Sequence, residues 1–287
     1  MTRTSRRIAV VPAYNEEPTV AAVLDELYPL VDELVVVDDG STDNTRLEIE
    51  RWMAGSGEPG SDGSRPRCHL LVHEVNQGMS EAYYTALSEL RERLRVGELH
   101  ADDLVFTVDA DGQHDLHVLN ELVQMTIDEG LDANLARRDL SYHGPFKRTG
   151  NWLLSKWASL WAWSPLHDVE SGYRIFRAGA LANALDYYQG YKYSETVEVA
   201  VVLWRLGYKV RNDVVVPVPI YRSRTSMIDV VIDLWSIPAA AIRVERRRPA
   251  TPEVLVPSLA KPLVVTAALA VTGIGAVAGA LRLLRRS

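Results

Sequence analysis

Residues 104–114 read LVFTVDADGQH, an apolar run of strand length that ends in an acidic turn. Asp109 and Asp111 lie two residues apart directly after this run, so both carboxylates can turn toward one divalent cation. Mg²⁺ and Mn²⁺ prefer such hard oxygen ligands together with substrate phosphates, and the cation would neutralise a diphosphate as it leaves. The stretch therefore predicts a buried strand with a metal site at its carboxyl end. His114 is either a further ligand or a packing residue.

Strand-length apolar runs alternate with helix-period segments through the first half of the chain, which is the pattern of βαβ units and a mainly parallel sheet flanked by helices. We expect strands at residues 8–13, 34–38, 68–73, 104–109 and 133–137. We expect helices between them at residues 18–30, 42–54, 78–94 and 115–129. The predicted fold class is α/β, and after about residue 138 the pattern becomes irregular.

Two further predicted strands also end in polar clusters. Residues 12–16 read PAYNE, and residues 37–41 read VDDGS. Ligands of open α/β sheets bind beyond the carboxyl ends of the strands, so both clusters should arrive at one crevice. Asp38 and Asp39 are poor core residues, because burying adjacent carboxylates without partners is costly. Asp39 either hydrogen-bonds a nucleotide base or ribose, or belongs to a solvated turn before the next helix.

Composition excludes several classes of protein. The chain has 287 residues and a formal charge of −7, which argues against nucleic acid as its main partner. A single cysteine, Cys68, excludes an internal disulfide and a cysteine-based zinc site, and this fits a reducing compartment. The chain is therefore an ordinary folded protein with one large domain and an appendage.

Four of the seven tryptophans lie close together after the irregular pattern begins. They are Trp152, Trp157, Trp161 and Trp163. Tryptophan suits a boundary between apolar and wet surroundings, because its ring is large and its N–H needs a partner. This segment is either a core helix or a helix at a membrane interface.

The last sixty residues are typical of a membrane-attached chain. Residues 227–244 are apolar with a few charges and should lie at an interface. Residues 262–281 carry no charge, and at about 1.5 Å per residue they reach about 30 Å, the thickness of a bilayer core. They form either a transmembrane helix or a buried or dimer-forming helix. Basic residues are more frequent before this segment than after it, which favours a cytoplasmic catalytic domain.

These motifs, in this order and spacing, resemble those of the GT-A glycosyltransferases of family 2. Within that family the chain is similar to dolichol-phosphate mannose synthase and the bacterial polyprenyl-phosphate glycosyltransferases, over residues 8–226. The resemblance implies a GT-A fold with a Rossmann-like sheet. We expect a catalytic domain at residues 1–226, an amphipathic juxtamembrane segment at 227–260 and a single-pass membrane anchor at 261–287.

The resemblance also implies roles for individual residues. The nucleotide pocket would be lined by Pro12, Tyr14, Glu16, Asp38 and Asp39. The metal, Mg²⁺ or Mn²⁺, would be held by Asp109, Asp111 and Gln113. Family members place phosphate-binding basic residues at the positions of Arg137, Lys147 and Arg148, although these could also be solvated loop charges.

Two segments further along the chain match the acceptor and closing motifs of the family. Residues 168–174 resemble an Asp-x-x-Ser-Gly-Phe-Arg motif, in which Arg174 could bind a phosphate bidentately. Arg222 and Arg224 lie where the family has a basic loop that closes over the donor diphosphate. Asn76 and Gly78 match an Asn-x-Gly segment, although residues 79–81 depart from it.

The implied reaction is the inverting transfer of one sugar from a GDP-mannose or UDP-glucose type donor to a polyprenyl or dolichyl phosphate. Such an acceptor is already largely ionised at neutral pH and needs no strong base. If the acceptor were a saccharide or protein hydroxyl, Asp168 would be the best candidate for a general base. A nucleotidyltransferase and an inactive membrane scaffold are the remaining alternatives.

Overall fold

The computed structural model describes residues 4–55, 67–141, 143–190, 194–217, 227–247, 262–264 and 266. Contacts divide the chain into two compact units, Met1–Pro249 and Ala250–Ser287. The first unit contains the sheet and the helices described below.

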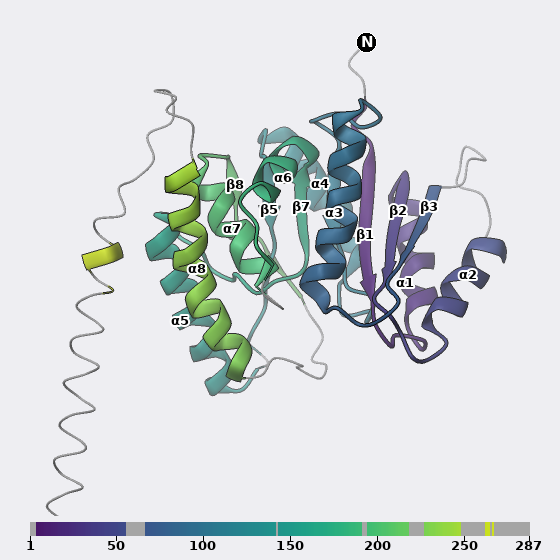
Figure 1. Ribbon diagram of the computed structural model, residues 1–287, viewed down its shortest axis with the longest axis horizontal. Helices are drawn as coiled ribbons and strands as arrows, with labels where there is room; N and C mark the ends of the chain where they lie inside the picture. The colour runs from purple at the N-terminus through teal and green to yellow at the C-terminus, as the bar shows by residue number, and fades with distance from the viewer. Residues whose placement is uncertain are drawn as a thin grey trace, which may run out of the picture. The chain divides into compact units, whose positions relative to one another are not determined.

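A seven-stranded sheet with the order β3-β2-β1-β4-β7-β5-β8 forms the centre of the first unit (Figure 1). Its strands are β1 (Arg7–Ala13), β2 (Glu33–Asp38), β3 (Arg67–Val72), β4 (Leu104–Thr107), β5 (Ala133–Leu135), β7 (Arg174–Arg177) and β8 (Val210–Arg211). Neighbouring strands are parallel except at β7, which runs antiparallel to β4 and β5. The mainly parallel sheet is therefore confirmed. Two short strands, β6 (Arg137–Arg138) and β9 (Val215–Val216), form a separate parallel pair.

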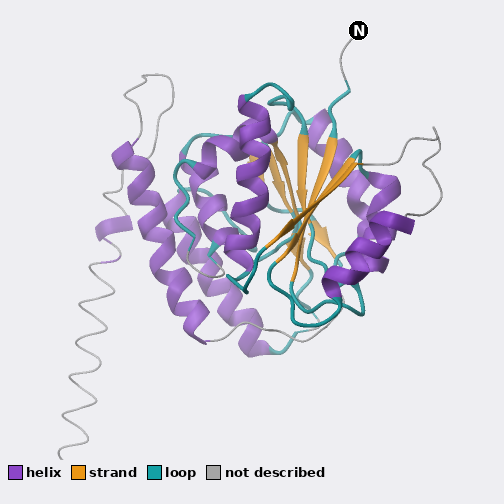
Figure 2. Ribbon diagram, turned by 45° about the vertical axis from the view of Figure 1, so that its right-hand side comes forward, coloured by secondary structure: helices purple, strands orange, loops and turns teal. Residues whose placement is uncertain are grey.

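Helices lie on both sides of this sheet (Figure 2). They are α1 (Val20–Leu27), α2 (Thr45–Gly55), α3 (Met79–Arg95), α4 (Leu119–Asp128), α5 (Pro145–Ala162), α6 (Ala178–Leu185), α7 (Glu195–Arg205) and α8 (Met227–Arg247), with 3-10 turns at Tyr28–Leu30 and Leu116–Val118. The first four agree with the predicted helices to within a few residues. The sequence pattern after residue 138 was interpreted as irregular, but this part of the chain contains helices α5, α6, α7 and α8. One reason lies in α7, where buried charged residues such as Glu195, Glu198 and Arg205 interrupt the apolar period.

The two central strands explain why the sequence shows continuous apolar runs. Every side chain of residues 8–11 in β1 and 34–37 in β2 has no exposed surface. Strands of a parallel sheet that is covered on both faces have this composition. Charged residues of the two strands stand only at their ends, Arg7 and Glu33 at the amino ends and Asp38 at the carboxyl end of β2.

The tryptophan-rich segment forms α5, whose earlier and later turns differ in burial. Trp161, near the end of the helix, is 1% exposed and packs edge to face against Trp157. Trp157 donates its ring N–H to the Leu234 carbonyl of α8 at 3.0 Å. In the earlier turns, Trp152 is 57% exposed and Leu153 is 56% exposed. The end of α5 is thus core, while its earlier turns present apolar side chains to solvent.

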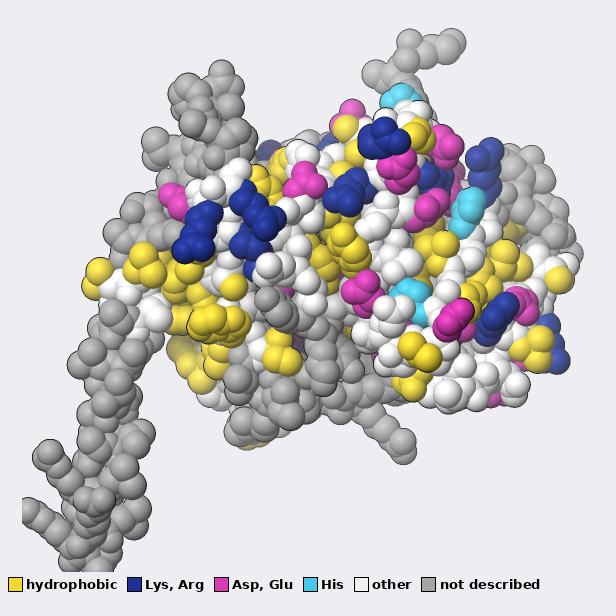
Figure 3. Space-filling view, in the orientation of Figure 1, with side chains coloured by type: hydrophobic (Ala, Val, Ile, Leu, Met, Phe, Trp, Pro, Cys, Tyr) yellow, Lys and Arg dark blue, Asp and Glu magenta, His cyan; other side chains and the backbone are white. Residues whose placement is uncertain are grey.

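Helix α8 covers the whole of residues 227–244, the segment expected at an interface, and packs against α5 and α7. Arg243 is buried and forms an ion pair with Glu198 of α7, so it is not a free juxtamembrane charge. Leu234 and Trp235 point outward, and Trp235 is 72% exposed. Figure 3 shows apolar side chains gathered on the surface in the region of α8.

Most of the expected membrane anchor, residues 262–281, lies outside the described residues. Of this stretch the structure describes residues 262–264 and 266, which are helical. Within the part of the chain that is described, no helix has the length and apolar character needed to cross a membrane.

Candidate active site

The acidic turn, residues 109–114, follows β4 at the carboxyl edge of the sheet. The hydroxyl of Tyr83 donates to Asp109 Oδ1 at 3.0 Å, and the backbone N–H of Gln113 donates to Asp111 Oδ1 at 3.0 Å. Burial and the Asp109 carboxylate raise the pKa of the Tyr83 hydroxyl, so Tyr83 remains a donor. Gly112 has a φ of 71°, which permits the tight reversal. These contacts orient both carboxylates at the carboxyl end of β4.

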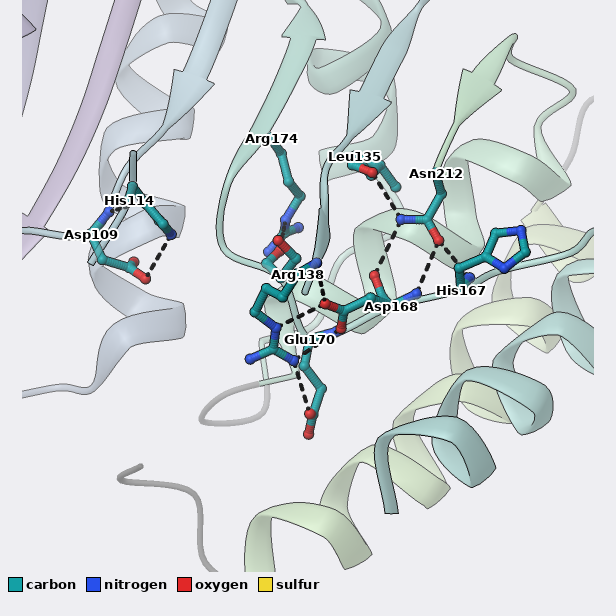
Figure 4. A network of polar contacts seen from close by, with 10 residues as sticks. Asp109, His114, Leu135, Arg138, His167, Asp168, Glu170, Arg174 and Asn212 are labelled. Atoms are coloured by element: carbon teal, nitrogen blue, oxygen red, sulfur yellow. Dashed lines mark hydrogen bonds and ion pairs between the residues drawn. The ribbon is translucent and has the colours of Figure 1, made fainter. Parts of the chain in front are cut away.

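His114 belongs to the turn itself. Its Nδ1 accepts the backbone N–H of Asp109 at 3.2 Å, and its Nε2 lies 3.6 Å from Asp109 Oδ2 (Figure 4). The ring stacks on Tyr173 at a centroid distance of 4.9 Å. Of the two roles expected for His114, this geometry favours packing and orientation of Asp109.

A cavity of about 250 Å³ adjoins the acidic turn. Its lining includes Thr19, Val23 and Glu26 from the α1 side and Asp109, Asp111 and His114 from the turn. The Thr19 hydroxyl donates to the Ala110 carbonyl at 2.8 Å and ties the turn to the start of α1. The two predicted carboxylate ligands thus border an open space at the sheet edge.

The residues of the acidic turn fit a divalent cation. No group of three or more His, Cys, Asp or Glu side chains converges as a complete metal site within the described ranges. Two carboxylates and the Gln113 amide form a partial set of oxygen ligands. Mg²⁺ is commonly bound by one or two carboxylates, with water and substrate phosphates completing its shell. The donor set therefore suits a cation that binds together with a diphosphate.

The polar clusters after β1 and β2 meet, as the topology rule predicts. The N–H of Asn15, a residue with a φ of 55°, donates to Ser41 Oγ at 3.0 Å. Asn15 Oδ1 accepts the Thr42 N–H at 2.8 Å, and the Glu16 N–H donates to Thr45 Oγ1 at 2.7 Å. These contacts join the two loops and leave the Tyr14 side chain exposed at their edge.

Asp39 has a more structural position than the sequence suggests. Its carboxylate contacts the His73 ring at 2.6 Å and accepts hydrogen bonds from the Asn76 side chain and from the N–H groups of Gln77 and Gly78. These contacts use the lone pairs that a direct bond to a base or ribose would need. Asp39 therefore fixes residues 73–78, beside the predicted nucleotide pocket.

Two other residues expected in the nucleotide pocket are also buried. Pro12 lies inside β1 opposite Val37, and Asp38 accepts the Ser41 N–H at 3.2 Å. Burying the adjacent carboxylates of Asp38 and Asp39 does not carry the expected free-energy cost, because both accept hydrogen bonds. Of the five residues expected to line the nucleotide pocket, the exposed Tyr14 and the partly exposed Glu16 are the most accessible.

The acceptor-side loop, residues 168–174, places its arginine in the interior. Arg174 is 2% exposed, donates to the Ser171 carbonyl and forms an ion pair with Glu195 at 3.0 Å. Burial raises the pKa of Glu195 even though Arg174 opposes this shift. Arg174 thus directs its charge toward Glu195, a partner that no sequence signal indicated, and its role toward a phosphate stays a prediction.

Asp168 is also buried, and Arg138 of β6 binds it bidentately at 2.8 and 2.9 Å (Figure 4). Burial alone would raise the pKa of Asp168, but the ion pair and hydrogen bonds lower it below its ordinary value. A general base must reach the proton that it accepts. This arrangement argues against the role of base that the sequence suggested for Asp168.

The basic residues expected to bind phosphate lie around β6 and the first turn of α5. Arg137 and Arg148 are exposed, and Lys147 is half-buried. Burial, followed by the nearby Arg138, lowers the pKa of Lys147. Arg222 and Arg224, expected to close over the donor, lie outside the described residues.

Comparison with known proteins agrees with this geometry. The sequence model described as glycosyl transferase family 2 matches residues 8–183. The UDP-N-acetylglucosamine–dolichyl-phosphate N-acetylglucosaminyltransferase of Methanococcus voltae is 27% identical over 67% of this chain and 78% of its own length. The dodecaprenyl-phosphate galacturonate synthase of Rhizobium johnstonii is 26% identical over 60% of this chain and 48% of its own length.

The fold is also shared with a solved structure. Glucosyl-3-phosphoglycerate synthase from Mycobacterium tuberculosis, in complex with Mn²⁺ and UDP-glucose, superposes with a TM-score of 0.56 at 19% identity. The match covers 87% of this chain and 82% of that one. At this identity the likeness concerns the fold, which is α/β with a mostly parallel central sheet.

Proposed function

The chain belongs to glycosyl transferase family 2 and is a glycosyltransferase, and from this premise we propose that it transfers one sugar from a nucleotide-diphosphate sugar to a polyprenyl phosphate. The reaction inverts the anomeric configuration and takes place at the cytoplasmic face of a membrane. Residues 262–281 serve as its anchor.

The observation that carries this proposal is the surface of α5. Arg148 and Trp152 are four residues apart, both are exposed, and residues at this spacing are neighbours on a helix. An arginine binds a phosphate, and an exposed indole next to it suits the boundary where an apolar chain begins. Lys147 adds a second positive charge in the same turn. A phosphorylated lipid combines the two chemical features that this surface would recognise.

The membrane location is supported by α8, which packs beside α5. Leu234 and Trp235 are exposed there, and the Leu234 carbonyl accepts the Trp157 ring N–H at 3.0 Å. Exposed Trp and Leu side chains on two adjacent helices can enter the interfacial layer of a bilayer. The acceptor phosphate would then meet the enzyme at the depth of the lipid head groups.

The chemistry needs little proton transfer. A phosphate monoester is largely doubly ionised at neutral pH, so its oxygen can attack the anomeric carbon directly. Mg²⁺ or Mn²⁺ would be held with the donor diphosphate by Asp109, Asp111 and Gln113. Tyr83 and His114 orient Asp109. The cation, when bound, neutralises charge on the leaving nucleoside diphosphate. The protein contributes mainly positioning and electrostatic stabilisation.

The names of two relatives support a lipid acceptor, since they specify a dolichyl phosphate and a dodecaprenyl phosphate. A second candidate is a small phosphorylated acid, because the solved structure with the same fold belongs to a glucosyl-3-phosphoglycerate synthase. The basic residues Lys147 and Arg148 would serve either acceptor. The exposed Trp152 favours the lipid.

One experiment separates these acceptors. The full chain in membranes is incubated with radiolabelled GDP-mannose, UDP-glucose or UDP-N-acetylglucosamine, together with polyprenyl phosphate or 3-phosphoglycerate. We expect label from one donor in an organic-phase, acid-labile lipid. Label confined to a water-soluble product, with none in lipid for any donor, would refute the lipid-phosphate proposal and leave the glycosyltransferase assignment intact.

A further inference from the structure

The Asp168 carboxylate is the centre of a buried network that joins three segments. Its Oδ2 accepts the backbone N–H of Arg138 at 3.0 Å and Nε of the same residue at 2.8 Å. Its Oδ1 accepts Arg138 Nη2 at 2.9 Å and the Glu170 N–H at 3.3 Å. With its amide nitrogen directed toward the acids, Asn151 of α5 donates to Asp168 at 3.1 Å and to Glu170 at 3.2 Å. Strand β6, helix α5 and the acceptor-side loop therefore meet at one carboxylate.

Asn212 fixes the backbone of the same loop from the other side. Its Oδ1 accepts the N–H groups of His167 and Asp168 at 2.7 and 3.2 Å. Its Nδ2 donates to the carbonyls of Leu135 and Asp168 at 2.9 and 3.2 Å (Figure 4). Asn212 is 4% exposed. Both the side chain and the backbone of Asp168 are thus fully engaged by neighbouring segments.

The other end of the loop touches the metal ligand. The Thr107 hydroxyl of β4 donates to the Gly172 carbonyl at 2.6 Å. A Cβ added at Gly172 would lie 2.9 Å from Asp109 Oδ2, so a larger residue here would push the Asp109 carboxylate from its place. The loop that runs from Asp168 to Gly172 therefore contacts α5 at one end and approaches Asp109 at the other.

Helix α5 carries the basic residues of the proposed acceptor site. Lys147 and Arg148 lie four and three residues before Asn151, within one helical turn. A displacement of Asn151 from Asp168 would move these cations relative to the acidic turn. Misplacement by about 1 Å far from the reacting atoms can cost about 100-fold in rate, because the reactants are no longer aligned.

We propose that Asp168 is a positioning residue, which sets the distance between the acceptor-binding cations of α5 and the metal ligands of the acidic turn. This proposal rests on the proposed function. Asp168 then acts through Asn151, Arg138 and Gly172, and it exchanges no proton with the acceptor. Its five donors leave no lone pair for a substrate hydroxyl.

The test is a comparison of steady-state kinetics for the full-length wild type and the Asp168→Asn variant, with purified acceptor and donor. We expect the acceptor KM to rise at least about tenfold and kcat to fall, while the donor KM stays within about twofold. The pH profile of kcat should keep its shape. A lost general base would instead lower kcat at an unchanged acceptor KM and remove the acid limb of that profile; that result would overturn the proposal.

A matched control separates positioning from general loss of stability. Glu33 and Arg93 form another buried ion pair, at the opposite, amino end of the sheet. Glu33→Gln should lower the midpoint of thermal unfolding and leave the acceptor KM within about twofold. A rise of the acceptor KM in this control equal to that of Asp168→Asn would also overturn the proposal.

Asn151→Ala keeps the experiment decisive if Asp168→Asn does not fold, because it removes only the contact from α5. We expect a smaller rise of the acceptor KM, about threefold or more, with an unchanged donor KM. An unchanged acceptor KM would refute the positioning role. All variants are assayed with the acceptor that the wild type uses, either lipid phosphate or 3-phosphoglycerate. The choice of acceptor by the wild type tests the proposed function, whereas the acceptor KM of the variants tests the positioning role.

Discussion

The acidic turn and the acceptor-side loop both carry charged motif residues, yet they place the charges differently. Asp109 and Asp111 are partly exposed beside a cavity, and each accepts a hydrogen bond from its surroundings. Asp168 and Arg174 are each 2% exposed and paired with oppositely charged residues. Motif resemblance therefore identifies residues that matter, but burial decides whether a charge faces a ligand or a neighbouring segment.

The largest effect should come from the acidic turn. Asp111→Asn removes an anionic ligand, and we expect transfer to fall by about 1000-fold, with little change in the thermal unfolding midpoint. Asp115→Asn is the matched control: Asp115 accepts the His117 N–H at a helix start, so its loss should change activity by less than about twofold. Transfer assays at fixed Mg²⁺ or Mn²⁺ check both. Full activity of Asp111→Asn would remove the turn as the metal site.

Substitutions in the acceptor-side loop should mainly lower the free energy of unfolding. Arg174→Met leaves Glu195 buried without its partner and should lower the free energy of unfolding by about 3 kcal/mol, measured by urea denaturation. The control is Arg91→Met, which breaks the exposed pair with Asp186 and should cost less than about 1 kcal/mol. If Arg174→Met kept wild-type stability but lost transfer, Arg174 would face a ligand after all, and the comparison would fail.

The same loop predicts a pH dependence of stability. The pKa of Asp168 is lowered in the folded state, mainly because Arg138 outweighs the effect of burial, so its ion pair stabilises the fold above the unfolded pKa near 3.8. This contribution is lost as pH falls through the folded pKa. The difference in unfolding free energy between wild type and Asp168→Asn should therefore be largest near neutral pH and shrink below about pH 4. A difference that grew on acidification would contradict the assignment.

The smallest effect concerns the exposed cation of α5. Arg148→Ala should raise the acceptor KM about tenfold and leave both the donor KM and the unfolding midpoint unchanged. Lys156→Ala, an exposed basic residue eight positions further along α5, provides the control and should change neither constant. Equal losses for donor and acceptor in Arg148→Ala would show that this residue does not distinguish the two substrates.

The sequence was most informative where polar residues follow directly after an apolar strand. The apolar runs before Asp39 and Asp109 identified parallel strands, and the polar residues after them predicted one crevice. The topology confirms the sheet, and the contacts between Asn15 and Ser41 bring two of these loops together. Such predictions succeed because a fully buried parallel strand requires apolar side chains, while ligands bind at its carboxyl end.

The antiparallel strand β7 and helices α6 and α7 were missed. In α7 the reason is that buried charged side chains, whose partners lie far away in sequence, interrupt the apolar pattern. Glu198 pairs with Arg243, and Arg205 pairs with Glu245. A single-sequence pattern reads such residues as exposed. Tyr83, Arg138 and Asn151 were missed for a related reason: each acts by contacting a motif residue in another segment.

The sequence by itself determined the α/β class, the order of the first strands and the position of the acidic turn, since these follow from local pattern. Only the tertiary structure decided that Asp39 holds a loop, that Arg174 pairs with Glu195 and that Asp168 joins α5 to β6. The physical reason is that the role of a charged side chain depends on which opposite charge and how much water surround it. Those surroundings come from segments that are distant in sequence and adjacent only after folding.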